Sequence, residues 1–385
     1  DDLCERTGDT NNCHETWRTL KEENPENPVA CLHWGMALEA RGAYDEARAA
    51  YEKALSAGHD AGSARIRLGG VLACLDQAQT GIAMIQEAVS EAASLKGQAA
   101  WTCQNAGRIL LERNAPEAAA RLYRLAAEYV PDEAFYWLQL GVCFHLLDAV
   151  PDAVAAWRQA VVVASASPAA LESARKLDQT LNTEERLAFW RGVSEEQPDA
   201  PLPRLHYGFA LMESDAPDAL DFASALARQH GDLPDARMLY GLALCRAGES
   251  EAGLAVIASV IKEKPELKNE AAARLSAAAD KYIRSQRYEI ASHLLAAAAS
   301  FEPDNLAHTV ALGEALLGAD RLEEAAEQFF KVLMIVPEAS RSARFMDEAY
   351  RRMNATEARR SAWQEIAAAH PDAELPKQRL GANIE

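Results

Sequence analysis

The chain has 385 residues, of which 58 are acidic and 39 are basic, so its formal net charge is −19 at pH 7. A surface this acidic repels phosphate backbones, which argues against a general nucleic-acid-binding role. Nowhere do 18 apolar residues follow one another, so the sequence predicts no membrane-spanning helix.

Glycines recur along the whole chain at intervals close to 34 residues or to twice that number. A bulky residue followed eight positions later by proline keeps the same period, as in Tyr123/Pro131 and Phe329/Pro337. Self-similarity at this period predicts one helical unit copied along an array, instead of two or three globular domains. The glycines are Gly35, Gly69, Gly107, Gly141, Gly208, Gly241 and Gly313.

Residues 132–168 show the repeated unit most clearly. Trp137, Leu140, Gly141 and Phe144 are spaced so that they share one face of a helix. A proline-containing interruption follows, and then a second apolar stripe, so the segment predicts two short antiparallel helices. Small residues where the helices cross let their backbones approach closely.

This pattern resembles the tetratricopeptide repeat, whose consensus reads W-x2-L-G-x2-Y, then A-x3-F, then P. The second helix of the clearest copy carries Ala153-x3-Trp157, and another copy combines Gly313 with Ala325-x3-Phe329. The resemblance covers nearly all of the chain. It implies an all-α, right-handed superhelical solenoid of about eleven helix-turn-helix repeats. It also implies a protein that binds other proteins and does not catalyse.

We expect residues 1–385 to form a single solenoid. A short half-repeat at 1–28 opens it, the repeats near 168–200 and 270–304 are degenerate, and the last repeat, at 340–372, is basic.

Two spacings of 38 residues, from Gly69 to Gly107 and from Gly241 to Ala279, each contain about four extra residues. The extra residues fall near 90–98 and 262–269. We expect them to lengthen the second helix or its exit loop and to make the array irregular there.

The N-terminal half-repeat bears on the location of the protein. The chain begins at Asp1, in mid-motif and without methionine, and Cys4 and Cys13 face each other across the predicted helix pair. A disulfide there would staple the end, and two buried thiols are the alternative. A disulfide favours a periplasmic or other extracytoplasmic location in a bacterium. The start at Asp1 then follows removal of a signal peptide, and a missing upstream segment is the alternative. Five further cysteines, each alone in a predicted helix, favour the cytoplasm instead.

The sequence carries no motif for catalysis, for a metal or for a cofactor. It contains no C-x-x-C pair, no P-loop, no H-E-x-x-H helix and no G-x-S-x-G elbow. Cys13-His14 is similar to the end of a haem-attachment motif, but the preceding cysteine, Cys4, is nine residues away. We therefore predict no enzyme activity, no metal and no cofactor.

The resemblance places a concave face on the first helices of the repeats. In repeats of this type the second, fifth, ninth and twelfth positions line that face, counted so that the glycine is eighth. These positions are unusually apolar here, which predicts a groove for an apolar helix or extended segment of another protein. Packing between neighbouring first helices is the alternative. The predicted groove residues are Leu32, Met36, Trp101, Leu138, Val142, Leu205, Phe209, Met212, Met238 and Leu242.

Four arginines interrupt the acidic sequence in the last repeat. Arg341, Arg344, Arg351 and Arg352 share an arc of about 120° on one predicted helix. They predict a docking point for an acidic protein or a lipid headgroup. A solvated helix face, neutralised by carboxylates of the same helix, is the alternative.

Taken together, these features predict a scaffold or assembly subunit of a multiprotein complex, in the periplasm or envelope of a bacterium. Its partners are other protein subunits and not nucleic acid, and peripheral association with a membrane complex stays open. One alternative is a transient chaperone, or an adaptor for the export or maturation of a client protein. Another is a regulatory or accessory subunit of an enzyme.

Overall fold

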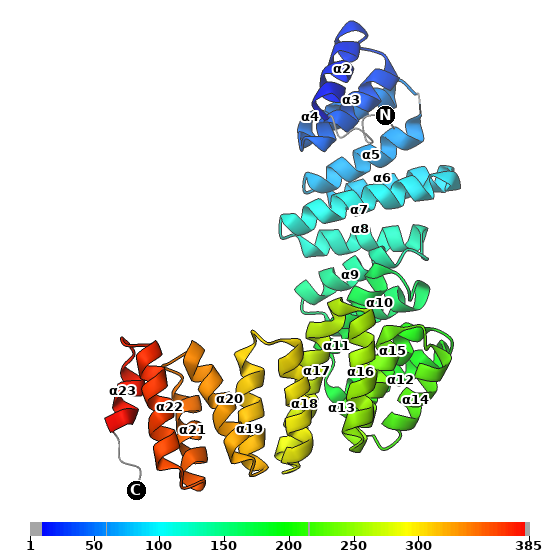
Figure 1. The fold of residues 1–385 in the computed structure, drawn as a ribbon. Helices are drawn as coiled ribbons and strands as arrows, with labels where there is room; N and C mark the ends of the chain where they lie inside the picture. The colour runs from blue at the N-terminus through cyan, green and yellow to red at the C-terminus, as the bar shows by residue number, and fades with distance from the viewer. Residues whose placement is uncertain (1–9, 59, 215, 382–385) are drawn as a thin grey trace. The chain divides into compact units, whose positions relative to one another are not determined.

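The computed structural model describes residues 10–58, 60–214 and 216–381, without the side chains of residues 10–14. Within these ranges every regular element is a helix: twenty-two α-helices, α2 to α23, and two short 3-10 helices (Figure 1). Successive helices pack against one another as antiparallel pairs. The predicted all-α repeat fold is therefore confirmed.

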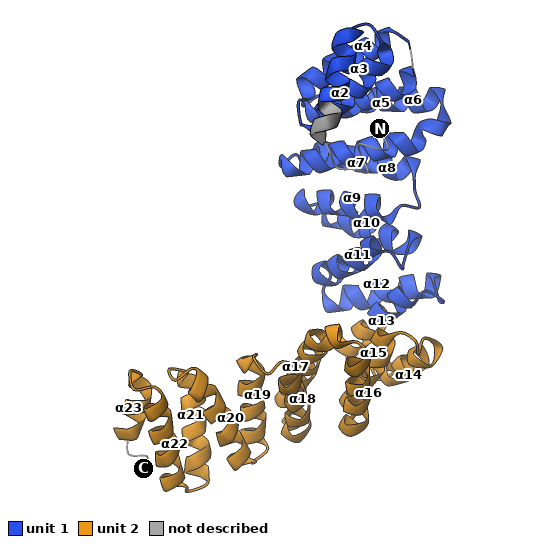
Figure 2. Cartoon of the chain, turned by 45° about the horizontal axis from the view of Figure 1, so that its top comes forward, with its two compact units in different colours: residues 1–206 blue, residues 207–385 orange. Residues whose placement is uncertain are grey.

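Contacts divide the chain into two compact units, residues 1–206 and 207–385 (Figure 2). Unit 1 contains α2 (Thr10–Glu23), α3 (Pro28–Ala40), α4 (Tyr44–Ser56), α5 (Ala61–Cys74), α6 (Ala78–Glu91), η1 (Ala93–Leu95), α7 (Lys96–Glu112), α8 (Pro116–Tyr129), α9 (Ala134–Leu146), α10 (Val150–Val163), α11 (Pro168–Thr180) and α12 (Thr183–Glu196). The boundary falls within α13 (Pro201–Glu213). Unit 2 continues with α14 (Ala219–Gln229), α15 (Pro234–Ala247), α16 (Ser250–Glu263), η2 (Pro265–Leu267), α17 (Lys268–Arg284), α18 (Tyr288–Phe301), α19 (Leu306–Gly318), α20 (Leu322–Ile335), α21 (Ser340–Arg352), α22 (Thr356–Ala369) and α23 (Glu374–Gly381).

The two units repeat each other element by element. Helices α3 to α12 reappear in the same order as α13 to α22, with lengths that are equal or nearly so. The offset is 173 residues from Pro28 to Pro201 and 172 from Lys96 to Lys268. The combination of a 3-10 helix and a 17-residue first helix occurs once in each unit, as η1 with α7 and η2 with α17. A block of five helix pairs is therefore present twice.

The two predicted insertions lie where the sequence indicated, in the segment that leaves the second helix and not in that helix itself. Helices α6 and α16 have 14 residues, like most other second helices. The extra residues form η1 and η2, and they extend the next first helix to 17 residues, where the other first helices from α3 to α21 have 13 or 14. Leu95 of η1 packs against Gly62 at the start of α5, so an apolar anchor holds the added turn on the neighbouring first helix.

The period of the sequence has its origin in a close contact between the two helices of a pair. A Cβ atom added to Gly313 would lie 2.8 Å from the ring of Phe329, and one added to Gly107 would lie 2.8 Å from the ring of Tyr123. Both rings are fully buried. A larger residue at the glycine position would push the second helix away and open a void around the ring.

The turn inside each pair is also repeated. Seven residues after the glycine position, one residue adopts the left-handed conformation that favours glycine, asparagine and aspartate. The turn between α11 and α12 is one residue shorter, and Leu181 is extended there. The left-handed residues are Gly42, Asp76, Asn114, Asp148, Gly248, Gln286, Asp320 and Asn354.

In the last repeat a buried ion pair replaces the small residues. Asp347 stands where most other repeats have glycine, and Arg359 where most have alanine or glycine in the second helix. Arg359 Nε donates to Asp347 Oδ1 at 2.6 Å, and Trp363 Nε1 donates to the same oxygen at 2.8 Å. Arg379 of α23 donates to Asp347 Oδ2 at 2.9 Å. Charge-assisted hydrogen bonds thus compensate the burial of this carboxylate and tie α23 to the repeat.

This network predicts a non-additive pair of substitutions. Arg359→Ala alone should lower the free energy of unfolding by about 3 kcal/mol, because Asp347 stays buried without its closest cation. Asp347→Gly alone should lower the free energy of unfolding by a similar amount, because the buried Arg359 guanidinium then loses its carboxylate partner. The double variant restores a glycine–alanine contact like that of Gly313 and Ala325, so it should be more stable than either single variant.

Trp363 need not lose its hydrogen bond in the double variant. In an earlier repeat Trp157 Nε1 donates to the backbone oxygen of Leu138 at 3.3 Å, and Arg344 supplies the corresponding carbonyl in the last repeat. Urea unfolding followed by circular dichroism measures all three variants. Strictly additive losses would show that the two side chains are not coupled.

Candidate functional site

The structure moves four of the predicted groove residues into the core. Leu32, Leu138, Met238 and Leu242 are between 0% and 8% exposed. The reason is that the first helices of successive repeats contact each other. Helix α5 packs against α7, and α15 packs against α17. Leu32, Leu138 and Met238 stand at the fifth position and Leu242 at the ninth. The prediction that Leu138, Met238 and Leu242 line an open groove is corrected, whereas Leu32, although 8% exposed, lines the pocket described below.

The remaining six predicted groove residues reach the surface to different degrees. Trp101, on α7, is 40% exposed, which is unusual for a side chain of its size. The other five are partly buried: Met36, Val142, Leu205, Phe209 and Met212.

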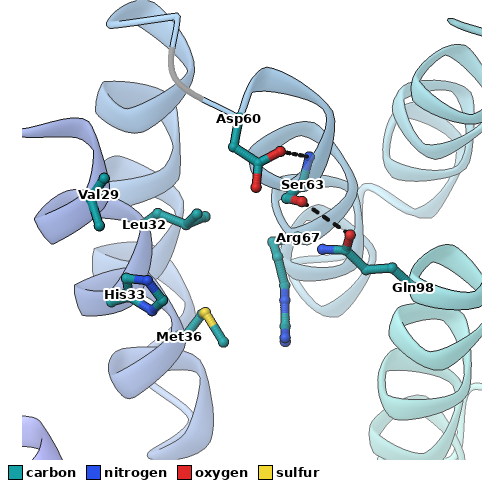
Figure 3. A pocket seen from close by; sticks show the side chains of 8 residues that line it. All are labelled: Val29, Leu32, His33, Met36, Asp60, Ser63, Arg67 and Gln98. Atoms are coloured by element: carbon teal, nitrogen blue, oxygen red, sulfur yellow. Dashed lines mark hydrogen bonds between the residues drawn. The ribbon is translucent and has the colours of Figure 1, made fainter. Parts of the chain in front are cut away.

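A pocket of about 230 Å³ lies between the first helices α3, α5 and α7 of unit 1 (Figure 3). Apolar side chains of α3 form one wall, and polar side chains of α5 and α7 form the other. The volume is below the roughly 300–1,000 Å³ of typical small-molecule sites, so the pocket suits one or two side chains of a protein partner. It is lined by Val29, Leu32, His33, Met36, Asp60, Ser63, Arg67 and Gln98.

Helix starts give this pocket its polar wall. Asp60 caps α5 by accepting a hydrogen bond from the backbone nitrogen of Ser63 at 3.4 Å. The hydroxyl of Ser63 donates to Oε1 of Gln98 at 3.0 Å, which joins α5 to α7 (Figure 3). Gln98 belongs to the extra turn at the start of α7, so the insertion supplies part of the pocket.

Arg67 is held from two sides beside the pocket. Its Nη1 atom lies 3.5 Å from Oε2 of Glu39, and its guanidinium group lies 4.5 Å from the centre of the Trp101 ring. Glu39 also accepts a hydrogen bond from the hydroxyl of Tyr51 at 2.7 Å. Burial, and then the Glu39 carboxylate, raise the pKa of Tyr51, so its hydroxyl stays a donor. The cation is therefore fixed over one face of the indole, and Trp101 as a whole remains 40% exposed.

His33 completes the wall formed by α3. Its ring stacks on Trp17 of α2, with the ring centres 4.4 Å apart. Burial lowers the pKa of His33, and nearby positive charge, including that of Arg67, lowers it further. The imidazole is thus neutral at pH 7, which leaves Arg67 as the charged donor of the pocket.

The duplication provides an internal control for these residues. In unit 2 the positions of Arg67 and Trp101 are occupied by Leu239, which is buried, and Ala273. Both units build the same helices, so the fold does not require an arginine held over a tryptophan at this place. Sequence reasoning found Leu32, Met36 and Trp101 but missed Arg67 and its partner Glu39. Comparing residues 172 positions apart would have revealed the difference.

The hydrogen-bonded Ser63 and Gln98 are replaced in unit 2 as well, by Asp235 and Glu270. Burial raises the pKa of Asp235, and the negative charge of Glu270 raises it further. Arg274 pairs with Glu270 and lies 3.5 Å from the centre of the Phe209 ring. The equivalent place in unit 2 therefore has a different chemistry.

The structure divides the four predicted basic residues by role. Arg352 donates to the backbone oxygen of Leu317 at 2.9 Å and pairs with Asp320 at 2.6 Å, so it caps the preceding first helix. Arg246 and Arg113 make the same kind of contact with the first helices that precede them. The assignment of Arg352 to a docking patch is therefore corrected.

The other three basic residues remain on the surface of α21. Arg351 pairs with Glu348 of the same helix at 2.7 Å, and Arg341 pairs with Glu314 of α19 at 2.6 Å. Arg344 makes no ion pair with any residue of the described ranges, and its guanidinium lies 4.9 Å from the centre of the Phe345 ring. Part of the predicted charge is thus neutralised within the chain.

The predicted disulfide falls outside what the structure describes, because Cys4 and the side chain of Cys13 are not among the described residues. The five other cysteines are buried free thiols. Burial raises the pKa of Cys31 and raises the pKa of each of the other four to about 12. These four are Cys74, Cys103, Cys143 and Cys245.

These thiols should be inert in the folded protein. With a pKa of about 12, roughly one thiol in 10⁴ is ionised at pH 8, and only the thiolate reacts. We expect Ellman's reagent to label these four cysteines at pH 8 only as the protein unfolds. Peptide mapping after a timed pulse measures each site, and fully denatured protein is the control. Rapid labelling of Cys143 in native protein would contradict its burial.

The described part of the chain contains no helix long and apolar enough to cross a membrane. In the same residues no three histidine, cysteine or acidic side chains are grouped so that they could hold a metal ion. The pocket of unit 1 combines an apolar wall, a fixed cation and hydrogen-bonding groups at two helix starts, and the exposed indole of Trp101 lies beside its Arg67.

Comparison with known proteins agrees with the helix pairs. The family model of the tetratricopeptide repeat matches residues 105–170 and 276–340, which are equivalent parts of the two units. No curated protein matches the chain.

Among solved structures, MamA is 16% identical over 43% of this chain and 87% of its own, with a TM-score of 0.33. The C-terminal part of a repeat protein from Cytophaga hutchinsonii is 12% identical over 81% of this chain and 97% of its own, with a TM-score of 0.41. The Cut9–Hcn1 complex is 11% identical over 98% of this chain and 94% of its own, with a TM-score of 0.37. These TM-scores are low, so the fold assignment rests on the helix pairs and on the family match.

Proposed function

We propose that this tetratricopeptide-repeat protein is a non-catalytic scaffold that holds another protein through the pocket between α3, α5 and α7. The observation that carries the proposal is the Arg67–Trp101 pair beside that pocket. A tryptophan that is 40% exposed and held under a fixed guanidinium is the kind of residue that dominates binding energy at protein interfaces. Its replacement by Ala273 in unit 2 argues that packing of the repeat does not need it.

The pocket suits an extended segment of the partner. One apolar side chain fits against Leu32 and Met36, and the exposed Trp101 covers the next part of the segment. The oxygen of the Gln98 amide is engaged by Ser63, which leaves its nitrogen to donate to a main-chain carbonyl of the partner. Asp60 supplies a carboxylate at the rim for a main-chain N–H group.

Two substitutions taken from unit 2 test the proposal. Trp101→Ala and Arg67→Leu introduce the residues of Ala273 and Leu239, which the same fold accommodates. Loss of a dominant contact, worth about 2 kcal/mol, should weaken partner binding about thirtyfold. The melting temperature should stay nearly unchanged in Trp101→Ala. It should fall in Arg67→Leu, because Glu39 then lacks its cation, whereas its counterpart in unit 2 is the apolar Met212. Purification of tagged protein from its native source, followed by titration with the co-purified partner, measures the effect.

Val150→Ala is the matched control, because Val150 is an exposed apolar residue of a second helix, away from the pocket. Equal binding by wild type and both pocket variants would overturn the assignment of this pocket. Recovery of the wild-type protein without any stoichiometric partner would favour the alternative, a transient chaperone or adaptor.

We also propose that the protein works outside the cytoplasm, in the periplasm or envelope of a bacterium. Cys4 and Cys13 support this, because the repeat register places them across one helix pair. The five lone cysteines do not oppose it, since buried thiols with a raised pKa resist oxidation.

Mass spectrometry of natively purified protein, without reduction, tests the location. We expect a linked Cys4–Cys13 peptide pair, and the bridge should stabilise the N-terminal end by about 2–3 kcal/mol, because it closes a short loop. Protein reduced before digestion is the control. Free thiols at both positions in native material would favour the cytoplasm.

A further inference from the structure

Helix α21 presents arginines where the equivalent helix of unit 1 does not. Counted from the glycine position, Arg344 of α21 corresponds to Leu171 of α11, and Phe345 corresponds to Glu172. Arg341, three residues earlier, corresponds to Pro168. The block of five helix pairs folds with the α11 residues in unit 1 and with the α21 residues in unit 2. Packing of the repeat therefore does not require the arginines and the phenylalanine of α21.

Two of these arginines gather around one aromatic ring. The guanidinium groups of Arg341 and Arg344 lie 5.9 and 4.9 Å from the centre of the Phe345 ring. Phe345 stacks in turn on the buried Phe329, with the ring centres 5.6 Å apart. The aromatic pair restrains both cations without neutralising them.

The carboxylates nearby leave this pair of arginines with net positive charge. Glu314 pairs with Arg341, whose side chain is 67% exposed, and Glu348 is engaged by Arg351. Arg344 has no carboxylate partner within the described residues. Exposed ion pairs such as Arg341–Glu314 are weak, so a carboxylate of a partner can compete for the arginine.

We propose that Arg341 and Arg344, with Phe345 between them, dock an acidic segment of a partner protein on α21. The proposal rests on the scaffold function proposed above, and it adds a second site in unit 2 with a chemistry different from that of the pocket. Guanidinium groups bind carboxylates through paired N–H donors, and Phe345 offers an apolar contact beside them.

An acidic protein segment fits this surface better than a membrane does. Recognition of anionic lipid by charge takes clusters of about four to eight basic residues. Here two arginines are available, in a chain whose net charge of −19 is repelled by an anionic bilayer. A short peptide carrying a few carboxylates can reach the two arginines without bringing a large negative surface close to the chain.

Fluorescence anisotropy with a defined peptide tests the site. The probe is a fluorescein-labelled dodecapeptide with four glutamates, and its counterpart has four glutamines instead. At about 50 mM salt, where charges interact over more than 10 Å, we expect the wild-type chain to bind the glutamate peptide about tenfold more tightly. Arg344→Leu, which introduces the residue of Leu171, should remove most of that preference, and about 300 mM salt should do the same.

Arg351→Gln is the matched control, because it removes one exposed arginine that Glu348 already engages. It should change the affinity less than twofold. Circular dichroism melting of both variants checks that the fold is kept. An equal loss of binding in both variants would overturn the proposal, because it would show a response to net charge alone.

Two further arms separate the possible causes of failure. Binding of the wild-type chain to vesicles with about one third phosphatidylserine, but not to the glutamate peptide, would overturn the protein-segment assignment. Trp101→Ala should leave glutamate-peptide binding unchanged, because Trp101 belongs to unit 1. Loss of native-partner binding in that variant alone would support the pocket of unit 1, whatever the outcome for α21.

Discussion

The structure depends on the close approach of the two helices in each pair. Where the first helix carries glycine, the ring or aliphatic side chain of the second helix occupies the space that a Cβ atom would fill. This contact recurs in most pairs, once in each, and therefore sets the period of the sequence. Among the described residues it has one ionic version, which shows how strict the constraint is. Asp347 occupies the glycine position only together with Arg359, Trp363 and Arg379, which supply three hydrogen-bond donors to its carboxylate.

The same constraint makes the duplication informative about function. Most positions that the contact requires have small residues in both units, as Gly141 and Gly313 do, and Asp347, whose counterpart is Ala174, is the exception. Positions on the exposed face of the first helices are free of that requirement, and there the units differ: Trp101 against Ala273, and Leu171 against Arg344. A comparison within one chain thus separates what the fold needs from what it tolerates. In both units, the positions that differ in this way lie on the exposed face of the first helices.

The sequence predicted the helix pairs and the places of the insertions, because both follow from spacing along the chain. It did not predict which of the positions expected on the concave face are in fact buried. Met238 is buried because α15 packs against α17, and that contact depends on the distance between neighbouring repeats. Nor did spacing show that Arg352 caps α19, since the carbonyl it meets is 35 residues earlier in the chain. Arg67 was missed because its partners, Glu39 and Trp101, come from two other repeats.

Neither proposed site is built for tight binding by itself. The pocket of about 230 Å³ has room for one or two side chains, and the arginines of α21 carry exposed charges that salt screens. Such sites become selective when one partner carries both an apolar segment and an acidic one, because the first contact raises the effective concentration of the second. Two equivalent blocks with different surfaces are a simple way to obtain selectivity for such a partner. Duplication supplies a second stable framework, and a few exposed side chains then give it a different preference.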